Sequence, residues 1–234
     1  MAVEIPLYKL LYLGIPLGVI WILSYRWGGP KYEIGVATGR MISQLLLIGY
    51  ALVFLFENES IWLGIGVLVV MSVAASVISI RPFKEQGKSV YLVALGAIIF
   101  SSIVHLVLIL YGVLGGTQLY EARVMIPIAG MLYSSAMNTV SQAGERYFHE
   151  RAEGKGHESA RNSAFKAGLI PKINTFLAVG LVSLPGMMTG QILSGTSPLI
   201  AVRYQIMVML MLFGSGGLSS ALFLHLIGRL KLRI

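Results

Sequence analysis

The sequence predicts an all-α, polytopic membrane protein: a bundle of about seven transmembrane helices, with the N-terminus outside and the C-terminus in the cytoplasm. Three observations lead to this fold class. The composition is 56% hydrophobic and only 12% charged, the mean hydropathy is +0.79, and long apolar segments alternate with short polar ones. Soluble domains carry about 25% charged residues, so the excess apolar surface indicates lipid as the solvent.

Each expected span satisfies the length requirement for crossing a bilayer, which is roughly 20 mostly apolar residues. The expected spans are Leu7–Tyr25, Val36–Phe56, Ile61–Ile80, Val90–Leu114, Val124–Ala143, Ile173–Leu193 and Leu199–Leu226. The connections are short except for residues 144–172, the one sizeable polar segment. We therefore predict a single transmembrane domain over residues 1–234, with a cytoplasmic segment at about 144–172.

The orientation follows from the distribution of basic residues. Most of the 18 lysines and arginines follow the first, third, fifth and seventh spans. The opposite side holds only Lys9 and Arg123. Cytoplasmic loops carry the excess of basic residues in membrane proteins, which places the C-terminus inside. An odd number of spans needs the two ends on opposite sides, so the charge pattern and the span count agree.

The composition also excludes several classes of site. There is no cysteine, which excludes disulfides, thiolate metal sites and cysteine nucleophiles. There is no aspartate either, and no glutamate lies in the middle of a span, so a tight site for a hard cation lacks ligands. The net charge of +8 reflects topology rather than nucleic-acid binding. The sequence leaves the metal-ligating residues unknown, and a transported metal would be held weakly or carried as a complex.

The fifth span carries a stripe of residues on one helical face. Met131, Ser135, Asn138 and Gln142 recur at helical spacing. Uncharged polar side chains inside a bilayer either bond neighbouring helices together or line a functional pathway. Both interpretations stay open for this stripe.

The sixth span contains Pro185 and Gly186, which predict a kink or break near the middle of the bilayer. Broken backbone at that depth is either buried in protein or lines a cavity, and transporters use such breaks to bind substrate. Met187, Met188 and Gln191 follow directly. They are candidate pathway residues, although methionine more often serves as an adaptable apolar filler.

Three further features of the spans are candidates for function. His105 lies near the centre of the fourth span, where it serves proton transfer or metal binding, or is a hydrogen-bonded structural residue. Arg203 either extends to the membrane surface or holds an anionic group on the pathway. The glycine-rich run Gly214–Gly217 indicates a hinge in the seventh span.

No enzymatic or nucleotide-binding motif is present. The sequence GKS at Gly87–Ser89 resembles the end of a phosphate-binding loop, but Pro82 occupies the position of the required earlier glycine. Ser215 and His225 could suggest an intramembrane protease, but Phe213 replaces the first glycine of that motif. We therefore expect no catalytic residues and no cofactor bound by this chain.

The cytoplasmic segment is the element most suited to docking a partner. Glu158–Leu169 reads as a short amphipathic helix. The residues expected to couple the chain to a partner are Glu150, Arg151, Lys155, Glu158 and Arg161. The alternative is a solvated loop without a partner.

Three long stretches resemble one known family. Gly39–Phe56, Val124–Asn138 and Gly168–Met209, the last with its LPGMM and VRYQI runs, are similar to the permease subunit of the iron-export ABC transporter family, which is related to the plant aluminium-sensitivity permeases. The resemblance covers nearly the whole chain. The cytoplasmic segment is shorter than in that family, so either Glu150–Lys166 still docks the ATPase or the coupling to it is altered.

The resemblance implies a homodimeric permease in the cell membrane, driven by two copies of a separate ATPase that bind ATP and Mg²⁺. It also implies export of iron or tolerance to another metal, although fold alone does not fix the substrate. Two alternatives remain: an ATP-independent secondary transporter or channel, and an intramembrane enzyme, for which no nucleophile and base pair is evident.

Overall fold

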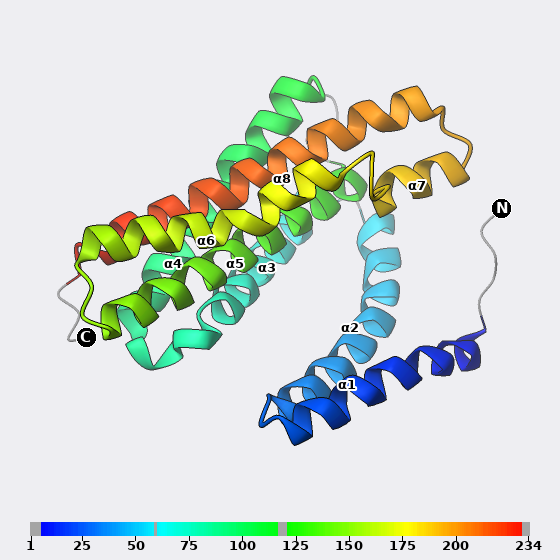
Figure 1. Cartoon of the computed structure of the whole chain (residues 1–234). Helices are drawn as coiled ribbons and strands as arrows, with labels where there is room; N and C mark the ends of the chain where they lie inside the picture. The colour runs from blue at the N-terminus through cyan, green and yellow to red at the C-terminus, as the bar shows by residue number, and fades with distance from the viewer. Residues whose placement is uncertain (1–5, 59, 117–120, 231–234) are drawn as a thin grey trace. The chain divides into compact units, whose positions relative to one another are not determined.

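A computed structural model of the chain describes residues 6–58, 60–116 and 121–230 (Figure 1). In these residues every regular element is a helix, apart from one isolated bridge between Val179 and Ser183. The all-α prediction is therefore confirmed. The chain divides after Asn58 into two compact units.

The first unit is a pair of apolar helices joined by a tight turn. Its elements are η1 (Leu7–Leu13), α1 (Gly14–Arg26) and α2 (Lys31–Glu57). Gly28 permits the turn, because its φ of 70° lies in the left-handed region that favours glycine. The Lys31 ammonium lies 4.1 Å from the centre of the Tyr25 ring. Trp21 Nε1 donates to the Lys31 carbonyl at 2.9 Å, so the turn is held from both sides.

The second unit is a helical bundle with α5 at its centre. Its elements are α3 (Ile61–Ser79), η2 (Arg81–Gln86), α4 (Lys88–Val107), the π-helical η3 (Leu108–Val113), α5 (Ala122–Ala152), α6 (His157–Ala178), α7 (Gly186–Leu193) and α8 (Pro198–Ile227). Helix α5 packs against α3, α4, α6 and α8, and α8 also packs against α4, α6 and α7. Small side chains such as Ala97, Ala136 and Ala143 are fully buried, which lets these helices approach closely.

Five of the described helical segments are long and apolar enough to cross a bilayer: η1 with α1, α2, α3, α4 with η3, and α8. Two of the expected spans do not meet that criterion. Helix α5 carries Ser135, Asn138 and Gln142 within its apolar part, and a break separates α6 from the short α7. The seven-span topology and its orientation therefore stay predictions.

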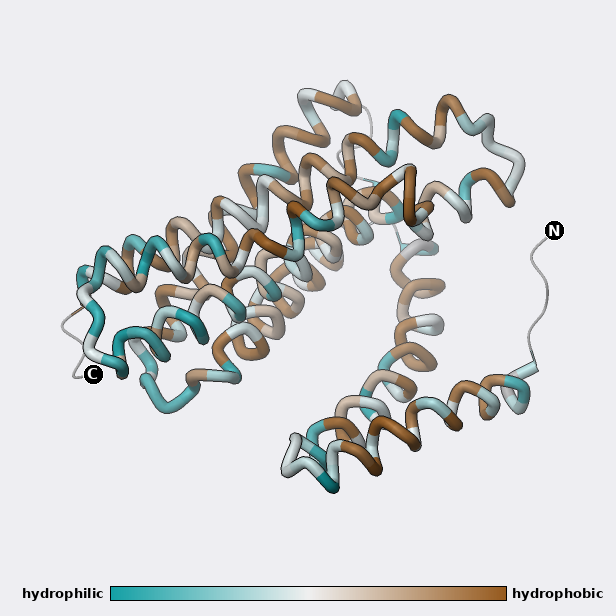
Figure 2. The backbone as a smooth tube through the Cα atoms, in the orientation of Figure 1, coloured by the Kyte–Doolittle hydropathy of each residue, from teal (hydrophilic) through white to brown (hydrophobic). Residues whose placement is uncertain are grey.

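Hydropathy separates two parts of the second unit (Figure 2). The ends of α5 and α6 that meet at their connecting turn are hydrophilic, whereas α3, α4 and α8 are mainly hydrophobic. Large apolar side chains such as Val70, Leu108 and Leu210 are exposed. Exposed apolar surface is unfavourable in water at roughly 25 cal/mol per Å², so this surface is suited to lipid.

Helices α5 and α6 form a long antiparallel hairpin around a turn at residues 153–156. The prediction of a polar segment with only a short helix over Glu158–Leu169 was wrong in extent. Both helices are longer because buried residues recur on them at helical spacing, namely Tyr147, Phe148, Ala160, Ala164 and Gly168. Gly154, with φ 83°, allows the sharp reversal between them.

Phe83 fixes η2 against α5 close to the tip of this hairpin. Its ring is 2% exposed, and its centre lies 5.1 Å from that of Phe148 and 5.9 Å from that of Phe223. Gly144 makes room for the ring, because a Cβ atom there would lie 2.3 Å from it. The contact joins η2, α5 and α8 about one helical turn before α5 ends at the hairpin turn.

Candidate functional site

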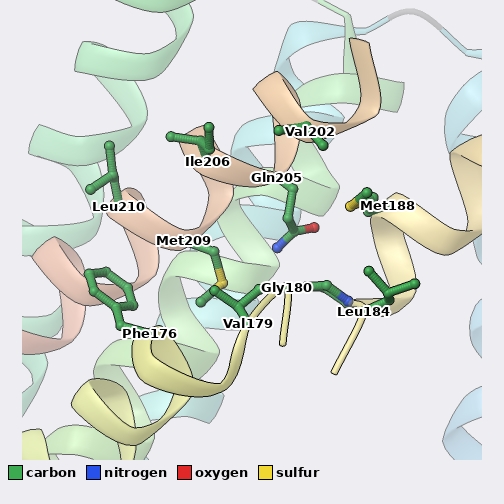
Figure 3. Close-up of a pocket in the computed structure, with 11 residues that line it drawn as sticks. Phe176, Val179, Gly180, Leu184, Met188, Val202, Gln205, Ile206, Met209 and Leu210 are labelled. Carbon is green, nitrogen blue, oxygen red and sulfur yellow. The ribbon is translucent and has the colours of Figure 1, made fainter. Parts of the chain in front are cut away.

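A cavity of about 340 Å³ lies beside α8, where the chain between α6 and α7 is not helical. It is lined by Phe176, Val179, Gly180, Leu184, Pro185, Met188, Val202, Gln205, Ile206, Met209 and Leu210. Figure 3 shows Gln205 extending from α8 toward the segment that holds Gly180 and Leu184, between Met209 and Met188.

The break in the helix forms one wall of this cavity. Helix α6 ends at Ala178, whose carbonyl accepts the backbone N–H of Val182 at 2.8 Å. Gly180 turns the chain with φ 83°, and its N–H donates to the Ser183 carbonyl at 3.0 Å. Helix α7 then begins at Gly186, directly after Pro185. The predicted break is confirmed, and it is a short non-helical segment rather than a kink.

One face of α8 forms the opposite wall. Its residues recur at the spacing of a single helical face: Val202, Gln205, Ile206, Met209 and Leu210. Helix α8 starts at Pro198, which suits the first position of a helix because proline lacks the N–H that would be unpaired there. The wall is therefore part of a continuous helix and faces the irregular segment.

Gln205 is the polar group of this cavity. The residue is 6% exposed, and its Oε1 has no hydrogen-bond partner among the described residues. A buried carbonyl oxygen without a partner costs about 1–3 kcal/mol. Such an atom calls for an explanation, and a ligand in the cavity is one.

The residues predicted around the break fall into two groups. Pro185 and Met188 line the cavity. Gly186, Met187 and Gln191 belong to α7 but are not among its lining residues. Their place on the pathway stays a prediction.

The predicted stripe on α5 is divided between the interior and the surface. Ser135 is 3% exposed, donates to the Leu212 carbonyl at 2.5 Å and accepts Lys172 Nζ at 2.7 Å. Asn138 and Gln142 are exposed within the second unit. For Ser135 the interhelical bond is thus the observed role, whereas the role of the two amides stays open.

His105 bonds within α4, beside two serine hydrogen bonds that join α4 to α8 and α8 to α5. Its Nδ1 lies 2.8 Å from the Ser101 carbonyl oxygen, Ser101 Oγ donates to the Ser215 carbonyl at 2.9 Å, and Ser215 Oγ donates to the Leu132 carbonyl at 3.3 Å. His105 Nε2 lies where a Cβ on Gly214 would approach to 2.3 Å. These contacts match the structural alternative for His105.

Two other expectations concern α8. The helix is continuous through Gly214–Gly217, and the glycines there allow close packing: a Cβ on Gly216 would lie 2.5 Å from Thr139 Oγ1. The expected hinge is therefore not visible as a break. Arg203 is exposed and does not line the cavity, which fits the surface-directed alternative.

The tip of the α5–α6 hairpin gathers the predicted coupling residues. Glu150 was expected to face a partner, but it is 2% exposed. Its Oε1 accepts Ser163 Oγ at 2.6 Å and pairs with Arg146 at 2.6 Å and Lys155 at 3.5 Å. Glu150 therefore holds the hairpin together and does not itself form a docking surface.

The other coupling candidates lie around this buried carboxylate. Arg151 Nη1 donates to the Lys155 carbonyl at 2.8 Å, and Lys155 Nζ also pairs with Glu153 at 3.3 Å. Arg161 lies 3.7 Å from the exposed Glu158 carboxylate. Arg151, Lys155 and Arg161 thus present positive charge beside the turn.

Two pKa values at the tip are shifted by their surroundings. The hydrogen bond from Ser163, aided by the charges of Arg146 and Lys155, lowers the pKa of Glu150 although burial opposes it. Burial, followed by the nearby charges of Arg161 and Arg151, lowers the pKa of His157. His157 Nδ1 lies 2.9 Å from the Tyr147 hydroxyl. The surroundings of the tip thus favour the ionised form of Glu150 and the neutral form of His157.

No cofactor site is evident in the described part of the chain. Within it, no three His, Cys, Asp or Glu side chains are grouped closely enough to hold a metal ion. Gly87 follows the 3-10 helix η2 and precedes α4, unlike a phosphate-binding loop, which follows a strand.

Sequence reasoning missed several residues of the site. Gln205, Met209 and Phe176 line the cavity, and Lys172 reaches into the bundle rather than ending a solvated segment. A signal existed for Gln205, because it is an uncharged polar residue in a long apolar helix. Phe176 carried no such signal, since its role depends on where α6 ends.

Comparison with known proteins gives the family. The model of the uncharacterised protein family UPF0014 matches residues 9–231. A UPF0014 membrane protein of Synechocystis is 34% identical over 226 residues, covering 89% of this chain and 86% of its own length. Protein ALUMINUM SENSITIVE 3 of Arabidopsis thaliana is 33% identical, with 85% and 77% covered. The probable iron export permease protein FetB of Escherichia coli is 31% identical, with 81% and 78% covered.

No solved structure matches the chain significantly. The relatives and the apolar helices agree that this is a multi-pass membrane protein, and the resemblance to the iron-export permeases is confirmed. The chain belongs to the UPF0014 family of membrane proteins.

Proposed function

We propose that this chain is the permease subunit of an ATP-driven ABC exporter, with iron or another metal as its cargo. The names of two relatives support this, one an iron export permease and the other linked to aluminium sensitivity. A separate ATPase subunit binds ATP and Mg²⁺, and two copies of the permease form the membrane part of the complex.

The observation that carries the proposal is the link between the hairpin tip and the cavity. Helix α6 runs without interruption from His157 at the tip to Ala178 at the edge of the cavity. Close to the tip, Phe83 of η2 packs against Phe148 of α5. A partner that pushes on the tip therefore moves one wall of the cavity, because packed helices transmit displacement.

Co-expression with an ABC ATPase that lacks its own membrane domain tests the proposal. A stable complex whose ATP hydrolysis is stimulated by this chain, together with ATP-dependent export from inside-out vesicles, is the expected result. Metal analysis of cells that lack or overproduce the chain, across iron, manganese, zinc and aluminium, identifies the cargo. Transport in proteoliposomes without any ATPase would instead favour a secondary transporter or channel.

A further inference from the structure

We infer that the cavity beside α8 binds a neutral, mainly apolar small molecule that carries one hydrogen-bonding group, and that this group pairs with the Gln205 amide. The identification of that molecule as cargo rests on the proposed function, whereas its binding does not. A metal ion that enters the cavity does so inside a neutral complex with an apolar outer surface.

The size of the cavity suits a small molecule. Its volume of about 340 Å³ falls within the range of roughly 300–1,000 Å³ that is usual for ligand pockets. Phe176 lines it from the end of α6, Leu184 from the break and Ile206 from α8, and the exposed Leu184 and Ile206 leave it open to the surface. The walls therefore come from three separate elements, which is typical of a binding pocket.

The walls exclude a bare ion. No charged side chain lines the cavity, and Gln205 is the one side chain there with an amide or hydroxyl group. A charged ligand would lose its hydration without gaining a partner, which is strongly unfavourable. Hard cations need several oxygen ligands, and a single amide oxygen does not supply them. Met188 and Met209 are flexible and adapt their shape to an apolar ligand.

Gln205 indicates where the polar group of the ligand binds. Its Oε1 is buried without a partner among the described residues, and the side chain extends across the cavity (Figure 3). A ligand hydroxyl or N–H would remove the penalty of the unpaired oxygen. The site then discriminates against an analogue that lacks the donor, because that analogue leaves the oxygen unpaired.

The non-helical segment between α6 and α7 contributes residues to the wall of the cavity. Gly180 adopts φ 83°, so the chain turns there before α7 begins at Gly186. Gly180, Leu184 and the unpaired amide of Gln205 therefore line the same cavity from two different elements.

Photolabelling of the purified chain in lipid nanodiscs tests the inference. The probe is 4-hydroxybenzophenone, a neutral two-ring molecule with one hydroxyl donor, and the matched control is benzophenone, which lacks the donor. Irradiated benzophenones insert readily beside methionine side chains. We expect saturable attachment in the peptides that contain Met188 or Met209. The hydroxyl should lower the half-saturating concentration by roughly two- to tenfold, the value of one hydrogen bond.

Two variants test whether the Gln205 amide causes the difference in half-saturating concentration between the two probes. Gln205→Leu should remove the advantage of the hydroxylated probe. Gln191→Leu should retain it, because Gln191 is also an amide with an unpaired Oε1 but lies outside the cavity lining. The comparison of the two probes on the unaltered chain needs no variant, so it decides the question even if a variant fails to fold.

Three results would overturn the inference. The first is equal labelling by both probes of the unaltered chain, which would mean that the cavity holds a lipid chain or another purely apolar group. The second is unsaturable labelling spread over the lipid-facing helices. The third is protection of Met188 and Met209 by zinc sulfate, which would mean that a bare ion binds there. Because the assay uses no ATPase, failure of the proposed ATPase partnership leaves its outcome unaffected.

Discussion

The ammonium group of Lys172 on α6 donates to Ser135 Oγ on α5 at 2.7 Å. The same hydroxyl donates to the Leu212 carbonyl of α8 at 2.5 Å. One serine therefore joins three helices. Phe176, which lines the cavity, lies about one helical turn after Lys172 on α6. Any change at Ser135 affects how α6 sits against α5 and α8.

Ser135→Ala should destabilise the bundle by about 1–3 kcal/mol, because it leaves the Leu212 carbonyl and the Lys172 ammonium without this partner. Thermal unfolding in detergent measures the effect. Ser134→Ala is the control, since Ser134 is exposed on the same helix and should change little. Equal unfolding temperatures for the two variants would mean that the hydrogen bonds of Ser135 contribute nothing to stability.

Gly214→Ala should destabilise the contact between α4 and α8 by about 1–3 kcal/mol, the usual cost of overpacking. The new Cβ would lie 2.3 Å from His105 Nε2. Gly217→Ala is the matched control, because its nearest neighbour, Leu169 Cδ2, lies 3.7 Å away and alanine favours the helix. Thermal unfolding compares the two.

A second substitution shows whether the imidazole is the cause. Combining Gly214→Ala with His105→Ala should recover part of the lost stability, because the smaller side chain makes room for the methyl group. If the double variant is as unstable as the sum of the two single ones, the clash with His105 is not responsible.

The sequence was sufficient for the membrane character, the helix break and the family, because each depends on local composition or on a long specific motif. Pro185 directly precedes the first residue of α7, although the end of α6 at Ala178, seven residues earlier, carried no such signal. The length of the α5–α6 hairpin could not be predicted in this way. Its charged surface resembles a loop, and only packing by Tyr147, Phe148 and Phe83 makes it part of the fold.

The candidate site was predictable only where a residue is unusual for its segment. Proline in a span and glutamine in an apolar helix carry such a signal. Nothing in the sequence indicated that Glu150 is buried, since its charge suggested a surface residue. Only the hairpin brings Ser163 Oγ to within 2.6 Å of its carboxylate. The role of Gly214 was also hidden, because the partner that demands a small residue lies on another helix.

The α5–α6 hairpin should lose stability in acid. The pKa of Glu150 is lowered, chiefly by the hydrogen bond from Ser163. A lowered carboxyl pKa means that the ionised form stabilises the fold above the ordinary glutamate pKa, and that this stabilisation is lost as the pH falls through the lowered value. His157 acts in the same direction, because its lowered pKa disfavours the protonated form that accumulates below its ordinary pKa. Hydrogen exchange of the amides of α5 and α6 as a function of pH measures this.

Substitution separates the carboxylate from the histidine. Glu150→Gln should speed exchange in the hairpin at neutral pH and flatten the acid part of the profile. Glu153→Gln is the control, because Glu153 is 49% exposed and pairs only at the surface with His149 and Lys155. If the acid part of the exchange profile is unchanged in Glu150→Gln, a group other than Glu150 causes the loss of stability in acid.

Charge reversal at the tip should weaken the proposed ATPase complex. Arg151→Glu with Lys155→Glu replaces two positive charges beside the turn and should reduce co-purification at least tenfold if each contact contributes about 1 kcal/mol or more. Lys84→Glu is the control, because Lys84 is exposed on η2 rather than on the hairpin. Circular dichroism and the hydrogen exchange of α5 separate lost docking from a disrupted hairpin. Undiminished co-purification of a folded variant would place the contact elsewhere.

Gly180→Ala should alter the cavity, whereas Pro185→Ala alone should leave the break in place. Gly180 holds φ 83°, a conformation that costs a residue with a side chain about 1–2 kcal/mol. Pro185 lies at the end of the break, well after α6 has ended at Ala178, so its loss does not join the helices. Gly190→Ala is the control, because Gly190 is helical with nothing within 4 Å of a new Cβ. Thermal unfolding and ATP-dependent export measured on all three should single out Gly180→Ala. If Pro185→Ala has the larger effect on export, the proline rather than the glycine maintains the shape of this segment.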